Sequence, residues 1–206
     1  MSTFDWVLRA VVVLPLLYLT FLTVRDWLAA SRRGEAVSLL SESAGRPRPF
    51  WVQVVTTIVG FAVAIPYFYY LWIPVWRPSP RLDQALNIVG VLVYVVGIGF
   101  AFVARSALGR NWGVSTGAQV KLVPGHELIR GGPYAVVRHP MYFGSWLAVL
   151  GLILIYPVWA LVILLPSMVV SFTRRALREE GALSARFGEA WAEYSRQTSF
   201  IIPFVW

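Results

Sequence analysis

The sequence predicts an all-α polytopic membrane protein, with five transmembrane helices and a small cytoplasmic cap. Apolar residues make up 58% of the 206 positions and charged residues only 14%, whereas about a quarter of an ordinary soluble chain is charged. The apolar residues gather in four charge-poor stretches, residues 6–24, 51–76, 85–104 and 140–173, and only Arg9 interrupts the first of them. Such a chain is expected to have the lipid bilayer as its solvent.

The first three stretches each have the length of one transmembrane helix. About 20 residues are needed to cross a hydrocarbon core roughly 30 Å thick, and the second stretch is long enough to tilt or to kink at Pro66. A cleaved signal peptide is the alternative for residues 6–24. That stretch lacks a clear basic segment before it and a small-residue cleavage site after it, so a retained helix is the preferred interpretation.

The fourth stretch is predicted to cross the membrane twice. Its 34 residues are too many for one helix, and Tyr156 and Pro157 lie at its centre, where a tight turn is expected. Residues 25–50, 105–139 and 174–197 each carry five arginines or lysines, and segments of this kind stay in the cytoplasm. A double crossing puts all three on that side. The N-terminus is then outside and the C-terminus cytoplasmic, in a bacterial inner membrane or an equivalent membrane.

The composition also excludes several classes of function. The chain has no cysteine and only two histidines, which rules out disulfides and thiolate nucleophiles and makes a protein-bound metal an unfavoured expectation. The net charge of +8 is explained by the basic cytoplasmic segments, so no nucleic-acid partner is expected. Gly97 and Gly99 lie inside a predicted span, without the third glycine of a dinucleotide-binding loop.

Residues 105–139 are too many for a simple connection between two spans. Residues 119–129 predict a small β-hairpin, because polar and apolar residues alternate and Pro124 and Gly125 supply a turn. Gly131, Gly132 and Pro133 then predict an irregular passage. Arg138 and His139 then precede Pro140, whose ring suits the first turn of a helix. A helix N-terminus attracts anions, so this tripeptide resembles a carboxylate or phosphate site.

Residues 174–197 are predicted to continue the last span as a single helix beyond the membrane. Its apolar face carries Leu183, Phe187, Trp191 and Tyr194. Of these, Trp191 and Tyr194 are core aromatics, membrane-interface anchors or ligand-stacking groups. Glu180 shares this face and needs a cationic partner there, either an arginine of the protein or a ligand. Its neighbour Glu179, displaced by about 100°, is expected to share the face less well.

Taken together, these motifs resemble the isoprenylcysteine carboxyl methyltransferase family, integral-membrane S-adenosylmethionine-dependent enzymes related to phospholipid methyltransferases. The resemblance covers residues 125–203. It consists of GHELI at 125–129, GGPYAVVRHPMYFG at 131–144, an apolar hairpin, REEGAL at 178–183, FGEAWAEY at 187–194 and IIP at 201–203. Trp191 stands where the family pattern has tyrosine, which removes a hydroxyl group but keeps a ring for stacking.

The resemblance implies an S-adenosylmethionine pocket, with S-adenosylhomocysteine as product, built from the cytoplasmic loop and the C-terminal helix. Arg138 and Glu180 are implied as catalytic residues. The implied cofactor-binding residues are His126, Glu127, Leu128, Ile129, Tyr134, His139, Tyr142 and Glu180. A carboxylate can hold the cofactor's ammonium, a histidine its carboxylate and a tyrosine ring its sulfonium. Residues 105–206 would form the catalytic region, and the three-span region 1–104 would face lipid and substrate.

The expected reaction is methyl transfer to a lipophilic or prenylated acceptor, most simply the carboxylate of an isoprenylcysteine-like molecule. That group needs no base but does need a cation, and Arg138 is favoured over Arg174, Arg175 and Arg178 because it adjoins His139. The alternatives are a phospholipid or small-molecule methyltransferase and a sterol-type membrane reductase that uses NADPH. A non-enzymatic sensor or transporter subunit is disfavoured because the cores of the second to fifth spans lack charges.

Overall fold

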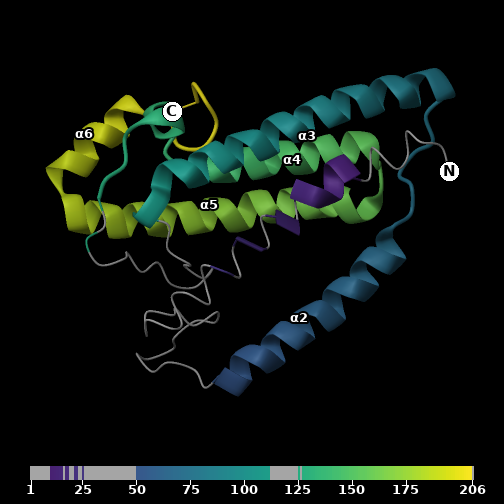
Figure 1. Ribbon diagram of the computed structural model, residues 1–206, viewed down its shortest axis with the longest axis horizontal. Coiled ribbons are helices and arrows are strands. Elements are labelled where there is room, and N and C mark those ends of the chain that lie inside the picture. Colours follow the sequence, from purple (N-terminus) through teal and green to yellow (C-terminus); the bar gives the residue numbers. More distant parts are fainter. Residues whose placement is uncertain are drawn as a thin grey trace.

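The computed structural model describes residues 10–15, 17–18, 21–22, 25, 50–111, 125 and 127–205 (Figure 1). Within these residues the fold is helical, and β-structure is confined to two isolated bridges. The elements are α2 (Phe50–Leu71), α3 (Pro80–Leu108), η2 (Gly109–Asn111), η3 (Gly132–Ala135), α4 (Pro140–Ile155), α5 (Trp159–Phe187) and α6 (Glu189–Gln197). The β-hairpin predicted at 119–129 falls mainly on residues outside the described ones, and residues 127–129 have no regular secondary structure.

The long apolar stretch 140–173 forms a helical hairpin, as predicted. Helix α4 ends at Ile155, the chain turns through Tyr156 and Pro157, and α5 begins at Trp159. Helices α3, α4 and α5 lie side by side, whereas α2 diverges from them toward its N-terminal end (Figure 1). The hairpin therefore returns the chain to the end of the bundle at which α4 began, and this brings residues 174–197 back toward Arg138 and His139.

Glycines allow α3 and α4 to pack closely. A Cβ atom placed on Gly97 would lie 2.5 Å from the backbone nitrogen of Ala148, and one on Gly151 would lie 2.5 Å from the nitrogen of Tyr94. These distances are far below normal contact, so the two backbones touch directly, in the manner of small-residue interfaces between membrane helices. Tyr94 is fully buried here and packs with Ile98 and Ala148.

Two tyrosine hydroxyl groups attach the remaining helical segments to this core. Tyr94 donates a 2.7 Å hydrogen bond to the carbonyl oxygen of Val12, a residue of the first predicted span. Tyr67 of α2 donates a 2.8 Å bond to the carbonyl oxygen of Ala160 at the start of α5. In an apolar environment each bond satisfies a polar group that would otherwise be costly to bury.

The described helices present the apolar surface that a bilayer requires. Helices α3 and α5 are long and apolar enough to cross a membrane, and α2 and α4 contain shorter apolar helical stretches. Large apolar side chains are exposed along α2 and α3, among them Val63, Tyr69, Leu92 and Val96, and lipid is the medium that would cover them. Five spans remain a prediction, because most of residues 6–24 lie outside the described residues.

The single helix predicted for residues 174–197 is wrong in one respect. The chain continues α5 without a break through Gly181, but it turns at Gly188, where φ is +52°. Glycine adopts this left-handed region without the steric cost that a Cβ atom imposes. Helix α6 therefore starts in a new direction, and Trp191 and Tyr194 do not continue the face of Leu183 and Phe187.

Candidate active site

The site forms where the start of α4, the charged end of α5 and the chain after α6 meet. The last segment runs parallel to the residues before α4, through a bridge between Val137 and Ser199. The backbone nitrogen of Arg138 donates to the carbonyl oxygen of Ser199 at 2.9 Å, and that of His139 donates to Phe200 at 3.2 Å. These bonds fix the backbone of Arg138 and His139 before Pro140 begins the helix.

Arg138 forms a buried ion pair with Glu180. Its Nε donates to Glu180 Oε1 at 2.7 Å, and the two side chains are 13% and 19% exposed. Its Nη1 donates to the carbonyl oxygens of Ser195, at 2.8 Å, and of Thr198. The guanidinium carbon also lies 5.6 Å from the centre of the Phe200 ring. Arg138 therefore ties α4, α5 and the segment after α6 together, rather than projecting toward open space.

His139 lies between two carboxylates. Its Nε2 is 3.2 Å from Glu180 Oε1, and its Nδ1 is 3.6 Å from Glu179 Oε2. Glu179 was expected to share the packing face less well than Glu180, but it too lies close to His139. Two successive residues of a helix point about 100° apart, and α5 is rotated so that His139 sits between the two directions. Both glutamates belong to the site.

Glu179 joins Tyr142 and Arg175 to the same group of charges. The hydroxyl of Tyr142 donates to Glu179 Oε1 at 2.7 Å, and Arg175 Nε donates to the same oxygen at 3.0 Å. The rings of Tyr142 and His139 stack with centroids 5.4 Å apart. We call the whole group the Arg138–Glu180 cluster; it comprises Arg138, His139, Tyr142, Arg175, Glu179 and Glu180.

Beside this cluster, α6 holds Tyr134 of η3 in place. The hydroxyl of Tyr194 donates to the backbone carbonyl of Tyr134 at 2.7 Å, and Trp191 packs against Tyr194 with ring centroids 5.5 Å apart. All three residues are buried. The hydroxyl of Tyr134 has no hydrogen-bond partner within the described part of the chain, so it can serve a ligand.

The surroundings set the protonation of three groups. Burial acts to raise the pKa of Glu180, but hydrogen bonds from His139 and Arg138, reinforced by their charges, outweigh it and lower the pKa below its usual value. Glu180 is therefore a carboxylate at neutral pH. Burial raises the pKa of Tyr134, with a further contribution from Glu179, and raises that of Tyr194 to about 12. Both tyrosines keep their hydroxyl protons.

The sequence-predicted binding residues divide into two groups. Tyr134, Arg138, His139, Tyr142 and Glu180 come together at this end of the bundle. Of the others, His126 lies outside the described residues, while Glu127 is exposed and its backbone nitrogen donates to Asn111 Oδ1 at 2.8 Å. Leu128 and Ile129 are half-buried in irregular chain.

Sequence reasoning missed Phe200, expected less of Glu179 than of Glu180, and named Arg175 only as a less favoured cation for the substrate carboxylate. Arg175 is four residues before Glu179, a spacing that predicts an ion pair on a helix. Glu179 adjoins Glu180, and such a doublet in an otherwise basic helix was a usable signal. No sequence signal pointed to Phe200, because its contact depends on the parallel bridge between Val137 and Ser199.

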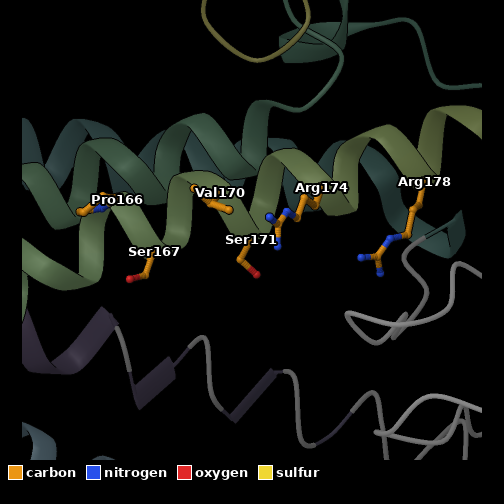
Figure 2. Close-up of a pocket in the computed structure, with 6 residues that line it drawn as sticks. All are labelled: Pro166, Ser167, Val170, Ser171, Arg174 and Arg178. Atoms are coloured by element: carbon orange, nitrogen blue, oxygen red, sulfur yellow. The ribbon is translucent and has the colours of Figure 1, made fainter.

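A groove of about 560 Å³ runs along another side of α5 (Figure 2). Ser167, Ser171, Arg174 and Arg178 line it, together with two apolar residues. Their spacing puts the four polar residues within about 60° of one another, whereas Glu180 lies about 200° around the helix from Arg178. The groove therefore opens away from the Arg138–Glu180 cluster, and its two arginines do not face that cluster.

With this geometry established, comparison with known proteins identifies the family. The family model described as phospholipid methyltransferase (PEMT) matches residues 86–190, just over half of the sequence. The chain belongs to the phospholipid methyltransferase family. The match extends from α3 to the start of α6 and includes every residue of the Arg138–Glu180 cluster. The cluster therefore lies within the part of the chain that the family model describes.

The fold agrees with that of a solved membrane methyltransferase. The structure of the eukaryotic intramembrane Ras methyltransferase ICMT (isoprenylcysteine carboxyl methyltransferase), without a monobody, matches with a TM-score of 0.53 and 23% sequence identity. The match covers 77% of this chain but 54% of that one, so the present chain corresponds to about half of the ICMT structure. At this identity the likeness shows a shared fold. The comparison with curated proteins gave no match.

Proposed function

We propose that this chain transfers a methyl group from S-adenosylmethionine to a lipophilic acceptor. The observation that carries the proposal is the Arg138–Glu180 cluster, which combines two carboxylates, two guanidinium groups, an imidazole and a phenol at the end of an apolar helical bundle. Within a methyltransferase family, such a cluster suits a zwitterionic cofactor, because the amino acid portion of S-adenosylmethionine carries one ammonium and one carboxylate. The alternative, a sterol-type reductase that uses NADPH, is not favoured by the family.

In the proposal, charged and polar groups of the cofactor have matching side chains in or beside the cluster. Glu180 uses Oε1 for both Arg138 and His139, and its Oε2 has no hydrogen bond within the described residues. In the proposal, Oε2 accepts from the cofactor's ammonium, and His139, whose Nε2 contacts Glu180 Oε1, holds that carboxylate in place for it. In the same proposal, the hydroxyl of Tyr134 and the ring of Tyr142 contact the rest of the molecule.

The backbone at 127–129, with His126, is proposed to border the adenosine. Residues 105–206 would then form the catalytic region, and residues 1–104 would lie on the side of lipid and substrate.

The chemistry makes limited demands on the protein. The bound cofactor supplies a methyl group on a positively charged sulfur. The acceptor oxygen forms a bond to this methyl carbon while the carbon–sulfur bond breaks and its electron pair stays on sulfur. The protein must align the three atoms and exclude water. Arg138 contributes by holding Glu180 and the segment around Thr198 in place, so its proposed role is positioning.

We propose an isoprenylcysteine-like carboxylate as the acceptor, which is already anionic and needs no base. Two features support this choice: the motifs resemble the isoprenylcysteine carboxyl methyltransferases, and the fold matches a protein of that name. A phospholipid amine is the alternative, and it would have to lose a proton during transfer. Incubation of the purified protein with methyl-labelled cofactor and either an S-farnesylated cysteine derivative or phosphatidylethanolamine distinguishes them. Label in the first supports the proposal, and label only in the second overturns the choice of acceptor.

The proposed orientation puts the cluster in the cytoplasm and the N-terminus outside, with five spans. The basic segments support this orientation through the positive-inside rule. Reporter fusions after Ser79 and after Gln197 should report opposite compartments. The same compartment for both would contradict the count of spans between them.

A further inference from the structure

A pocket of about 370 Å³ lies at the end of the bundle opposite the Arg138–Glu180 cluster. It forms between the connection from α2 to α3, the first turn of α3 and the turn from α4 to α5. The nitrogen of Val75 donates to the carbonyl oxygen of Pro157 at 2.7 Å, and that of Trp159 donates to Ile73 at 3.1 Å. Because the two connections are bonded to each other, the pocket walls are held by the fold itself.

Aromatic rings supply much of the pocket wall. Trp72, Trp76 and Tyr156 line it, and the rings of Trp72 and Tyr156 have centroids 5.8 Å apart. The two tryptophans are about half exposed, at 49% and 54%. Ring faces attract cations, and tryptophan is the best of the aromatic residues for quaternary ammonium groups.

Charges of both signs complete the lining. Arg77 and Asp83 both face the pocket, and they form no ion pair with each other or with another described residue. Asp83 accepts a 3.2 Å hydrogen bond from Asn87, one turn further along α3. Both side chains are exposed, so each can bind one charge of a ligand without first breaking an ion pair.

We propose that this pocket binds the headgroup of a zwitterionic phospholipid. The quaternary ammonium lies against the tryptophans and Asp83, and the phosphate lies on Arg77. The acyl chains then follow the apolar surface of the helices. A purely anionic headgroup fits less well, because it brings no cation to the tryptophans and Asp83. The site is separate from the methyl-transfer site and goes beyond the proposed function.

Lipid retention tests the proposal directly. The purified full-length chain is incubated with equal amounts of phosphatidylcholine and phosphatidylglycerol, and the lipids that remain bound are counted by native mass spectrometry. The wild type should retain phosphatidylcholine in preference. Equal retention, or a preference for phosphatidylglycerol, would overturn the proposal and indicate a general aromatic and basic membrane belt.

Matched variants locate the binding. Asp83→Asn and Arg77→Gln should each lower phosphatidylcholine retention by about tenfold, the effect of one charge-assisted contact. Arg81 lies in the first turn of α3, as Asp83 does, but it does not line the pocket. Arg81→Gln removes its charge and should behave as wild type. Unchanged retention in the first two variants would contradict the assignment. Binding of S-adenosylhomocysteine should be equal in all three, so this result is independent of the methyltransferase proposal.

Discussion

Replacing Glu180 with glutamine probes the site most sharply, because the shape is kept and one charge is lost. The carboxylate receives bonds from Arg138 Nε at 2.7 Å and His139 Nε2 at 3.2 Å, and it is only 19% exposed. A hydrogen bond to a charged group contributes about 1.5–3 kcal/mol. Glutamine keeps only a neutral acceptor, so we expect the free energy of unfolding to fall by about 1.5–3 kcal/mol, the contribution of one such bond. In a chain of this size, that loss lowers Tm by roughly 3–12 °C.

Cofactor affinity is the second quantity to measure. If Glu180 Oε2 holds the cofactor's ammonium, the Glu180→Gln variant should bind S-adenosylhomocysteine about tenfold to a hundredfold more weakly. Calorimetry on the folded fraction gives this value separately from thermal unfolding. A lower Tm with unchanged affinity would refute the cofactor role and leave Glu180 as a structural ion-pair partner.

The pH dependence gives a further check on the same variant. The pKa of Glu180 lies below its usual value of 4.5 in the folded chain, so the carboxylate stabilises the fold above that value. This stabilisation is lost as the pH falls through the lowered pKa. The difference in stability between wild type and Glu180→Gln should therefore be constant near neutrality and shrink below pH 4.5. A difference that does not shrink in acid would contradict the charge-based explanation.

Glu189 provides the matched control. It also lies in the C-terminal helical region, but it is 87% exposed and pairs with Arg196 at 3.3 Å. Surface ion pairs of this kind contribute about 0–1 kcal/mol. Glu189→Gln should leave both Tm and cofactor affinity close to wild type. A loss of affinity equal to that of Glu180→Gln would mean that the effect follows net charge rather than position.

Two further predictions concern the packing of the fold. Gly97→Ala should destabilise the protein by about 1–3 kcal/mol, because its new Cβ would meet the backbone nitrogen of Ala148. The control Gly99→Ala meets no atom within 4 Å and should stabilise the protein by about 0.5–1 kcal/mol. Equal unfolding temperatures of the two variants in detergent would contradict the close α3–α4 contact. Tyr194→Phe removes the hydrogen bond to the Tyr134 carbonyl and should cost about 0.5–1.5 kcal/mol near neutrality. Because the pKa of Tyr194 rises from 10.0 to about 12 on folding, the wild type should lose stability between pH 10 and 12 and the variant should lose less; identical alkaline unfolding curves would argue against this.

The sequence predicted those features of the helix arrangement that depend on charge and hydropathy. The turn at Tyr156 and Pro157 was predicted because a single crossing would have separated two basic segments across the membrane. The turn at Gly188 was not predicted. A glycine inside a helical pattern costs only about 1 kcal/mol relative to alanine, so the pattern allows either a continuous helix or a break, and contacts from Tyr194 to Tyr134 favour the break.

The sequence singled out part of the candidate site but not the geometry that joins its residues. The motif around Arg138 and the glutamate at 180 were both identified from the sequence. Their direct ion pair, and the place of Glu179 beside His139, depend on how α5 is rotated against α4. Packing along the whole hairpin sets that rotation, so it cannot be predicted from the helical periodicity of one segment.

The central claim is that the Arg138–Glu180 cluster belongs to an S-adenosylmethionine-dependent methyltransferase, and cofactor binding tests it without knowledge of the acceptor. Purified protein should bind S-adenosylhomocysteine in calorimetry with a Kd in the micromolar range, equivalent to about 8 kcal/mol, and should give no comparable heat with NADPH. Binding of NADPH in place of S-adenosylhomocysteine, or no heat from S-adenosylhomocysteine at saturating concentration, would contradict it.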